Sequence, residues 1–253
     1  MQLYLLSLNT IFSKKSIFVY AAMMLVLPLL LPHLTPWEEK PSLLQPDRAQ
    51  TAWAFLWFSG LVWLLLQGAS LGNAHHRNGI LQYFKTTGLG RLKQMFQIAA
   101  GCLTAFAIVA IIALSISVFG AMPGDAYEAK HWVILNFQYL VLFTLVTVPL
   151  LLLSVSLGTR FNSIIAYLIP FSIGVYGIVG ITYLDFFLAD SNIPAVDFIY
   201  SISPHYHLAD LTERLVFKMG SLSFPSFSSI SIYLIGIALV LSSTSVLLYR
   251  ENK

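Results

Sequence analysis

Six long apolar runs constrain this chain more than any other feature of its sequence. An α-helix needs about 20 apolar residues to cross the roughly 30 Å hydrocarbon core of a bilayer, and the runs have about that length. They are continuous, whereas a membrane β-barrel alternates apolar and polar residues. The sequence therefore predicts an all-α integral membrane protein, one domain over residues 1–253. The expected spans are Ser16–Leu31, Trp53–Leu71, Ile98–Gly120, Trp132–Leu157, Asn162–Leu184 and Ile230–Tyr249.

Charged residues avoid these runs. Only 10% of the chain is charged, against about 25% in globular proteins, and every charge falls in a loop, at an end or at the edge of a run. Ion-driven transporters generally use a buried ionisable group, although each costs about 2.5–3.5 kcal/mol in the membrane. The runs therefore disfavour ion-driven transport, and their larger polar residues are expected to join helices. Those residues are Gln67, Asn136, Gln138 and Asn162.

The basic residues favour an orientation with both ends in the cytoplasm. The segment 74–94 contains four basic residues and no acid, and short basic loops stay on the cytoplasmic side. We expect a multi-pass protein of the cytoplasmic (inner) membrane, whose net charge of +3 reflects topology and gives no basis for nucleic-acid binding. The basic residues expected inside are Lys14, Lys15, Arg77, Lys85, Arg91, Lys93, Arg160, Arg250 and Lys253.

Catalytic and metal-binding patterns are absent from the sequence. It contains no Walker motif, no zinc-protease motif and no nucleophile elbow. Cys102 is the single cysteine, and the pair His205 and His207 lacks a third ligand, so we expect neither a disulfide nor a metal site. We predict no catalytic residue and no enzyme activity, and a membrane-embedded enzyme is disfavoured.

Two segments on the cytoplasmic side are predicted to be helical without spanning the membrane. Residues 1–15 favour a helix lying in the membrane interface, with a frayed start to the first span as the alternative. Residues 76–93 favour a helix-turn-helix with its break at Gly88–Gly90. The second segment carries an apolar knob, expected to dock either on lipid headgroups or on a partner protein. The knob consists of Ile80, Leu81, Tyr83 and Phe84.

The expected outer segment, residues 185–229, contains signals for one amphipathic helix. Ser203 suits its cap, Pro204 its first position and Gly220 its end. Its apolar side would rest on the bundle or enter the outer leaflet, and consists of Leu208, Leu211, Leu215 and Met219.

The fifth span carries three small residues at close spacing. Gly174, Gly177 and Gly180 favour close approach of another helix. The simplest interpretation is packing within the chain, and a contact between subunits is the alternative.

Together these features resemble the membrane permease subunit of type-2 ABC exporters, over nearly the whole chain. In the coupling loop the similar residues are Arg77-Asn78-Gly79-Ile80-Leu81, Thr86-Thr87 and Arg91. In the outer segment they are Pro194, Pro204, His207, Asp210 and Arg214. The chain departs from the family where glutamates usually flank Gly79, where Thr87 replaces a proline, and where a G-x-x-F-P element would follow the fifth span.

The resemblance implies a transporter half that pairs with a second permease chain, identical or related, through the first and fifth spans. Separate ATPase subunits would bind ATP and magnesium, and this chain would bind no cofactor itself. The expected cargo is amphipathic, lipid-like or polymeric and leaves the cytoplasm. In this interpretation Gly79, the knob and Arg91 contact the ATPase, and Gly174, Gly177 and Gly180 pack the permease dimer. A non-transporting membrane scaffold or assembly factor is the alternative.

Overall fold

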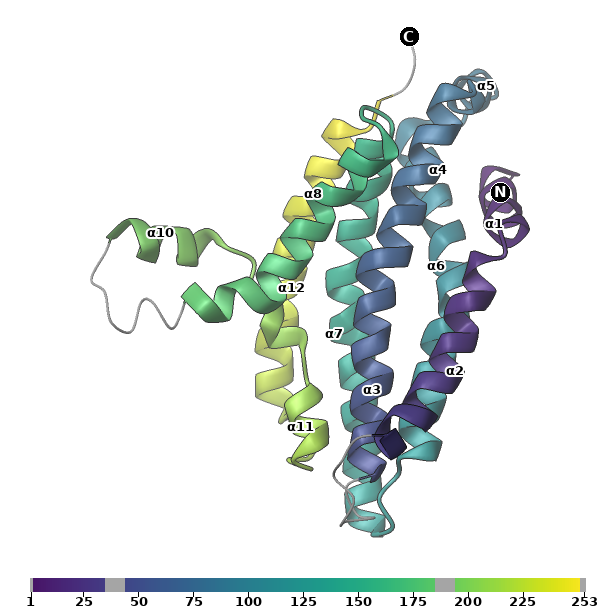
Figure 1. Ribbon diagram of the computed structural model, residues 1–253. Coiled ribbons are helices and arrows are strands. Elements are labelled where there is room, and N and C mark those ends of the chain that lie inside the picture. Colours follow the sequence, from purple (N-terminus) through teal and green to yellow (C-terminus); the bar gives the residue numbers. More distant parts are fainter. Residues whose placement is uncertain (1, 35–43, 185–193, 251–253) are drawn as a thin grey trace.

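The computed structural model describes residues 2–34, 44–184 and 194–250, and every regular element in these ranges is helical. The helices form an elongated bundle (Figure 1). Six of the described helical stretches are long and apolar enough to cross a membrane. The prediction of an all-α chain with six helices able to span a membrane is therefore confirmed. The stretches are Ser16–Leu34, Pro46–Arg77, Arg91–Gly120, Ala126–Gly158, Ser163–Leu184 and Phe224–Leu248.

Several of these stretches contain more than one regular element. The first is α2 (Ser16–Leu34), the fourth is α7 (Ala126–Gly158) and the sixth is α12 (Phe224–Leu248). The second joins α3 (Leu44–Ser59), the π-helical η2 (Gly60–Leu64) and α4 (Leu65–Arg77). The third joins α6 (Arg91–Ser115) to η3 (Ile116–Gly120), and the fifth joins α8 (Ser163–Val175) to η4 (Tyr176–Gly180).

The second and third spans are longer than the apolar runs that predicted them. The second extends from Pro46 to Arg77 rather than from Trp53 to Leu71, and the third begins at Arg91 rather than Ile98. Hydropathy marks only the part of a helix that matches the hydrocarbon core, whereas the backbone hydrogen bonds continue into the polar regions on either side.

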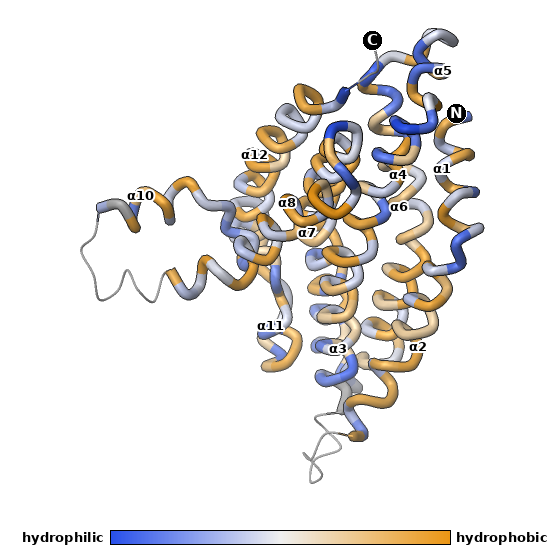
Figure 2. Tube along the Cα trace, turned by 45° about the horizontal axis from the view of Figure 1, so that its top comes forward, coloured by the Kyte–Doolittle hydropathy of each residue, from blue (hydrophilic) through white to orange (hydrophobic). Residues whose placement is uncertain are grey.

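Two helices form the centre of the bundle. In the apolar stretches of Pro46–Arg77 and Ala126–Gly158, 72% of the residues are buried, against 11% in Phe224–Leu248. The outer helices nevertheless carry apolar residues all along their length (Figure 2). A helix that is apolar all round yet little buried suits a surrounding of lipid rather than water.

The centre is held by close backbone contact between α4 and α7. A Cβ atom added to Gly72 would lie 2.3 Å from the Val155 carbonyl oxygen, and one added to Gly158 would lie 2.5 Å from that of Ala69. Ser154 donates to the Leu65 carbonyl at 2.6 Å across the same contact. Small residues let membrane helices approach in this way, and the Gly68-x-x-x-Gly72 pattern is the sequence signal for it.

The two ends of the bundle differ in charge. One end, called the basic end below, contains α1 (Gln2–Ser13), α5 (Ile80–Thr86) and the last residues of α12 (Figure 1). Among the described residues this end has no acid; its cations are Lys14, Lys15, Arg77, Lys85, Arg91, Lys93, Arg160 and Arg250. The opposite end carries both signs. The predicted orientation would put the basic end in the cytoplasm.

A left-handed residue separates α1 from the first span. Lys15 has φ 57°, so α1 is a distinct helix and not a frayed start of α2. It packs on α6, where a Cβ on Gly101 would lie 3.1 Å from Cβ of Ser7. Its position in a membrane interface stays a prediction.

The prediction of one continuous helix from Pro204 to Met219 is wrong. The segment instead contains α10 (Pro194–Ile202), the 3-10 turn η5 (Tyr206–Ala209) and the short α11 (Thr212–Val216). The Asp210 carboxylate accepts hydrogen bonds from the Thr212 backbone N–H at 3.0 Å and from its hydroxyl at 2.5 Å, which competes with helix formation. Part of the expected segment, 185–193, lies outside the described residues.

The apolar side of this segment is only partly as expected. Leu211 and Leu215 are buried, whereas Leu208 and Met219 are exposed. Leu211 and Leu215 therefore hold the segment against the bundle without a continuous helix.

Candidate functional site

The connection between the second and third spans is a short helix fixed between two left-handed glycines. Gly79 (φ 70°) precedes α5 and Gly88 (φ 86°) follows it. A Cβ at either position would meet no atom within 4 Å, so backbone conformation and not space favours glycine there. The predicted helix and its break near Gly88–Gly90 agree with this geometry.

The apolar knob predicted on α5 does not exist as one exposed surface. Leu81 is fully buried and Phe84 is 8% exposed, so both anchor α5 to the bundle. Tyr83 is 62% exposed, and Ile80 is partly buried. Residues on one face of a helix recur every three or four positions, which places Leu81 and Phe84 on the inner face and Tyr83 on the outer one. Arg91, at the start of α6, is also exposed.

Gln94 fixes α5 to the rest of the basic end. Its side-chain amide N–H groups donate to the carbonyls of Leu81 at 3.1 Å and Leu89 at 2.8 Å. Its oxygen accepts from the Tyr249 hydroxyl at 3.3 Å. Gln94 and Tyr249 are buried, so these bonds are shielded from water. One side chain thus connects α5, the start of α6 and the end of α12.

Further contacts tie the remaining helices to the basic end. Arg160 donates to the carbonyls of Leu248 and Leu247, and the Arg250 backbone N–H donates to the Thr159 hydroxyl at 2.8 Å. On α1, the Ser7 hydroxyl lies 3.0 Å from His75 Nε2 in a buried contact. The basic end is therefore one connected surface, to which α1, α5, the α7–α8 turn and α12 all contribute.

The glycines of the fifth span pack within the chain. A Cβ on Gly174 would lie 2.7 Å from Leu61 Cδ2, one on Gly177 would lie 2.6 Å from Tyr206 Cδ2, and one on Gly180 would meet its own helix at Tyr176. The resemblance implied that Gly174 and Gly177 pack against a second subunit. That prediction is corrected, because side chains of the same chain already fill the space beside both glycines.

At the opposite end, aromatic and amide side chains form a buried hydrogen-bonded cluster. The Trp53 indole N–H donates to Asn136 Oδ1 at 2.8 Å, and the Ser117 hydroxyl donates to the same oxygen at 2.5 Å. The Trp53 and Tyr139 rings stack with centroids 4.0 Å apart. Trp57 donates to the Tyr139 hydroxyl at 2.9 Å. This cluster confirms that Asn136 joins helices, as the sequence predicted.

Side chains of α7 hold the 203–223 segment. The Tyr139 hydroxyl donates to the Asp210 carboxylate, and the Gln138 amide exchanges two hydrogen bonds with the Leu222 backbone, at 2.9 and 3.0 Å. The Tyr233 hydroxyl accepts from the His205 backbone N–H at 3.1 Å. Burial raises the pKa of the Tyr206 phenol, and the neighbouring Tyr233 adds to the shift. The spacing of residues in the sequence predicted none of the hydrogen bonds that Tyr139 makes.

The two histidines of this segment, His205 and His207, lie close to each other. Their ring centroids are 5.5 Å apart, and His205 Nε2 lies 3.1 Å from the Tyr200 carbonyl oxygen. No group of three or more His, Cys, Asp or Glu side chains with metal-binding geometry occurs in the described residues.

Comparisons with protein families, with curated proteins and with solved structures found no match to this chain. The geometry of the basic end is thus the strongest guide to what the chain does. This end is a surface whose elements are joined by hydrogen bonds, with Tyr83 and Arg91 exposed on it.

Proposed function

We propose that this chain is the membrane-spanning subunit of an ATP-driven exporter, with ATP hydrolysed on separate subunits that dock at the basic end. The observation that carries the proposal is α5: a short helix between two spans, anchored by Leu81, Phe84 and Gln94, with Tyr83 turned outward. These buried anchors fix the position of α5, which supports docking of a partner protein on its outer face.

The contacts of α5 suit it to transmit force. It continues directly from α4 through Gly79 and leads into α6 through the Gly88 turn. Because α4 packs backbone to backbone on α7, a push on α5 would move α4 and α7 together. Closure of the ATPase subunits would tilt these spans and open a path in the assembled exporter. A second permease chain, identical or related, completes that assembly in our proposal.

The proposed cargo is amphipathic, lipid-like or polymeric. The apolar runs carry no Asp, Glu, Lys or Arg, so they offer no charged group for a small ion. The sparsely buried outer helices give such a cargo access from the lipid side.

The test is to change the exposed aromatic residue of α5 without changing its anchors. Tyr83→Asp should leave the chain folded, because Tyr83 is 62% exposed. We expect the ATPase activity that co-purifies with the tagged chain from native membranes to fall at least about tenfold, as for loss of an aromatic anchor at an interface. The matched control is Tyr127→Asp at the opposite end, where Tyr127 is 73% exposed. Equal recovery of ATPase with both variants would refute docking at α5.

The same purified complex can be used to distinguish an exporter from a non-transporting scaffold. Reconstituted into vesicles, an exporter complex should hydrolyse ATP faster when its amphipathic cargo is present. A complex whose ATPase rate is insensitive to every lipid or amphiphile added would favour the scaffold or assembly factor.

A further inference from the structure

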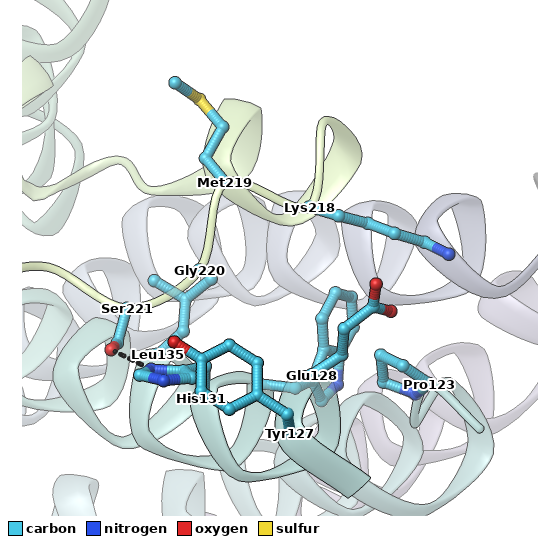
Figure 3. Close-up of a pocket in the computed structure, with 10 residues that line it drawn as sticks. Pro123, Tyr127, Glu128, His131, Leu135, Lys218, Met219, Gly220 and Ser221 are labelled. Atoms are coloured by element: carbon cyan, nitrogen blue, oxygen red, sulfur yellow. Dashed lines mark hydrogen bonds between the residues drawn. The ribbon is translucent and has the colours of Figure 1, made fainter. Parts of the chain in front are cut away.

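The end of the bundle opposite α5 contains an open pocket of about 370 Å³ between the start of α7 and the turn at 218–221. Its two walls come from segments about ninety residues apart, which Figure 3 shows facing one another. The lining residues are Pro123, Tyr127, Glu128, His131, Trp132, Leu135, Lys218, Met219, Gly220 and Ser221.

The two walls of this pocket carry side chains of opposite charge. Glu128 extends from α7 towards Lys218, which extends from the turn (Figure 3). Both are exposed, and no ion pair within 4.0 Å involves either of them in the described part of the chain. Within the described ranges both charges are therefore available to a ligand.

The turn that carries Lys218 is held in place. Lys218 has φ 49° and Gly220 has φ 73°, and a left-handed lysine persists only where its surroundings fix it. The Met219 backbone N–H donates to the Arg214 carbonyl at 3.0 Å. The Ser221 hydroxyl lies 3.0 Å from His131 Nδ1 and so joins the turn to α7. The fold therefore fixes the backbone positions from which Glu128 and Lys218 extend into the pocket.

This charge arrangement selects a ligand that carries both signs. A simple anion near Lys218 would be repelled by Glu128, and a simple cation near Glu128 would be repelled by Lys218. A primary ammonium group can donate to the Glu128 carboxylate, whereas a trimethylammonium group has no N–H to donate. A phosphate can accept from Lys218, as charge-assisted hydrogen bonds require.

The surroundings of the pocket indicate a lipid as the source of such a ligand. Apolar side chains are exposed around it, namely Phe217, Met219 and Phe224. Exposed apolar groups beside the end of a span are expected at the depth of lipid headgroups. The buried Trp132 and Leu135 give the pocket an apolar base.

We propose that this pocket binds the headgroup of a zwitterionic aminophospholipid of the ethanolamine type, its ammonium against Glu128 and its phosphate against Lys218. This assignment concerns the chain alone and does not depend on an ATPase partner.

The test measures lipid binding to the purified full-length chain in detergent. Short-chain phosphatidylethanolamine should bind about tenfold more tightly than phosphatidylcholine or phosphatidylglycerol, the effect of one charge-assisted hydrogen bond. Glu128→Gln should remove the preference for ethanolamine without weakening phosphatidylglycerol. Lys218→Gln should weaken both phosphatidylethanolamine and phosphatidylglycerol.

Two charge-matched controls lie outside the pocket. Lys130→Gln on α7 and Glu213→Gln on α11 change exposed residues that do not line it, and both should bind as the unmodified chain does. Equal affinity for the three lipids, or an unchanged preference in Glu128→Gln, would overturn the proposal. Glycerophosphoethanolamine, the headgroup without acyl chains, should bind more weakly; if it binds as tightly, a soluble zwitterion and not a lipid is the ligand.

Discussion

Gly72 on α4 and Gly158 on α7 meet with their backbones in contact. A Cβ on Gly72 would lie 3.4 Å from Cα of Gly158 and 2.3 Å from the Val155 carbonyl oxygen. Real Cβ atoms do not approach a backbone oxygen so closely, and a carbonyl oxygen within a helix has little freedom to move. The α4–α7 crossing therefore has room for glycine alone at these positions.

Gly72→Ala should destabilise the bundle by about 1–3 kcal/mol, the usual cost of overpacking, and lower its thermal unfolding midpoint in detergent. Gly236→Ala on α12 is the control, because a Cβ there meets nothing within 4 Å. It should be neutral or slightly stabilising, since alanine favours a helix over glycine. If the Gly72→Ala protein is as stable as the Gly236→Ala protein, α4 and α7 are not in close backbone contact at Gly72.

Gln94 should control how firmly α5 is held. Gln94→Ala removes the hydrogen bonds to Leu81, Leu89 and Tyr249. Lost buried hydrogen bonds cost about 1 kcal/mol or more each, so amide exchange within residues 80–89 should quicken about tenfold or more. Hydrogen exchange followed by mass spectrometry measures this directly. Gln82→Ala on the exposed face of α5 is the control and should leave exchange unchanged. Equal exchange in the two variants would mean that Gln94 does not anchor α5.

The apolar runs predicted which segments are helical because burial in lipid demands length and hydrophobicity, and both are visible in sequence. They did not show which face of each helix points inward. Tyr83 and Phe84 are adjacent aromatic residues, yet only Phe84 is buried. That choice depends on the packing of α4 and α6 beneath them, which is tertiary information.

Hydrogen-bonding partners were equally invisible in the sequence. Gln94 was not singled out, because a lone glutamine beside a basic loop has no distinctive pattern. In the 203–223 segment, capping signals predicted one helix, and the Asp210 contacts with Tyr139 and Thr212 replaced it with two short pieces. Contacts across about seventy residues override a local signal in that segment.

Tyr139 should hold the 203–223 segment against α7. Tyr139→Phe keeps the ring that stacks on Trp53 but leaves the Asp210 carboxylate and the Trp57 indole N–H without this partner. Hydrogen bonds to charged groups are worth about 1.5–3 kcal/mol, so the thermal unfolding midpoint should fall measurably. The control Tyr127→Phe, at a residue that is 73% exposed, should leave the unfolding midpoint unchanged. Equal midpoints for the two variants would show that the Tyr139 hydroxyl contributes nothing.

Tyr206 should make the protein sensitive to alkali. Its ring packs on Gly177, and its buried hydroxyl has no hydrogen-bond partner in the described part of the chain. Burial raises its pKa above the ordinary 10.0. The unfolded chain therefore loses this proton first as pH rises, so the stabilising contribution is complete below about pH 10 and disappears towards the higher pKa of the folded state. Tyr206→Phe removes this ionisation and should match or exceed the unmodified protein in stability near neutral pH.

The comparison that decides this point is the unfolding midpoint at about pH 7 and about pH 11, in the range where tyrosine ionises. The unmodified chain should lose more stability between these pH values than Tyr206→Phe does. Tyr83→Phe, at an exposed position, controls for the loss of a tyrosine and should behave like the unmodified chain. If Tyr206→Phe and Tyr83→Phe lose stability in parallel as pH rises, the Tyr206 hydroxyl reaches water and is not buried against Gly177.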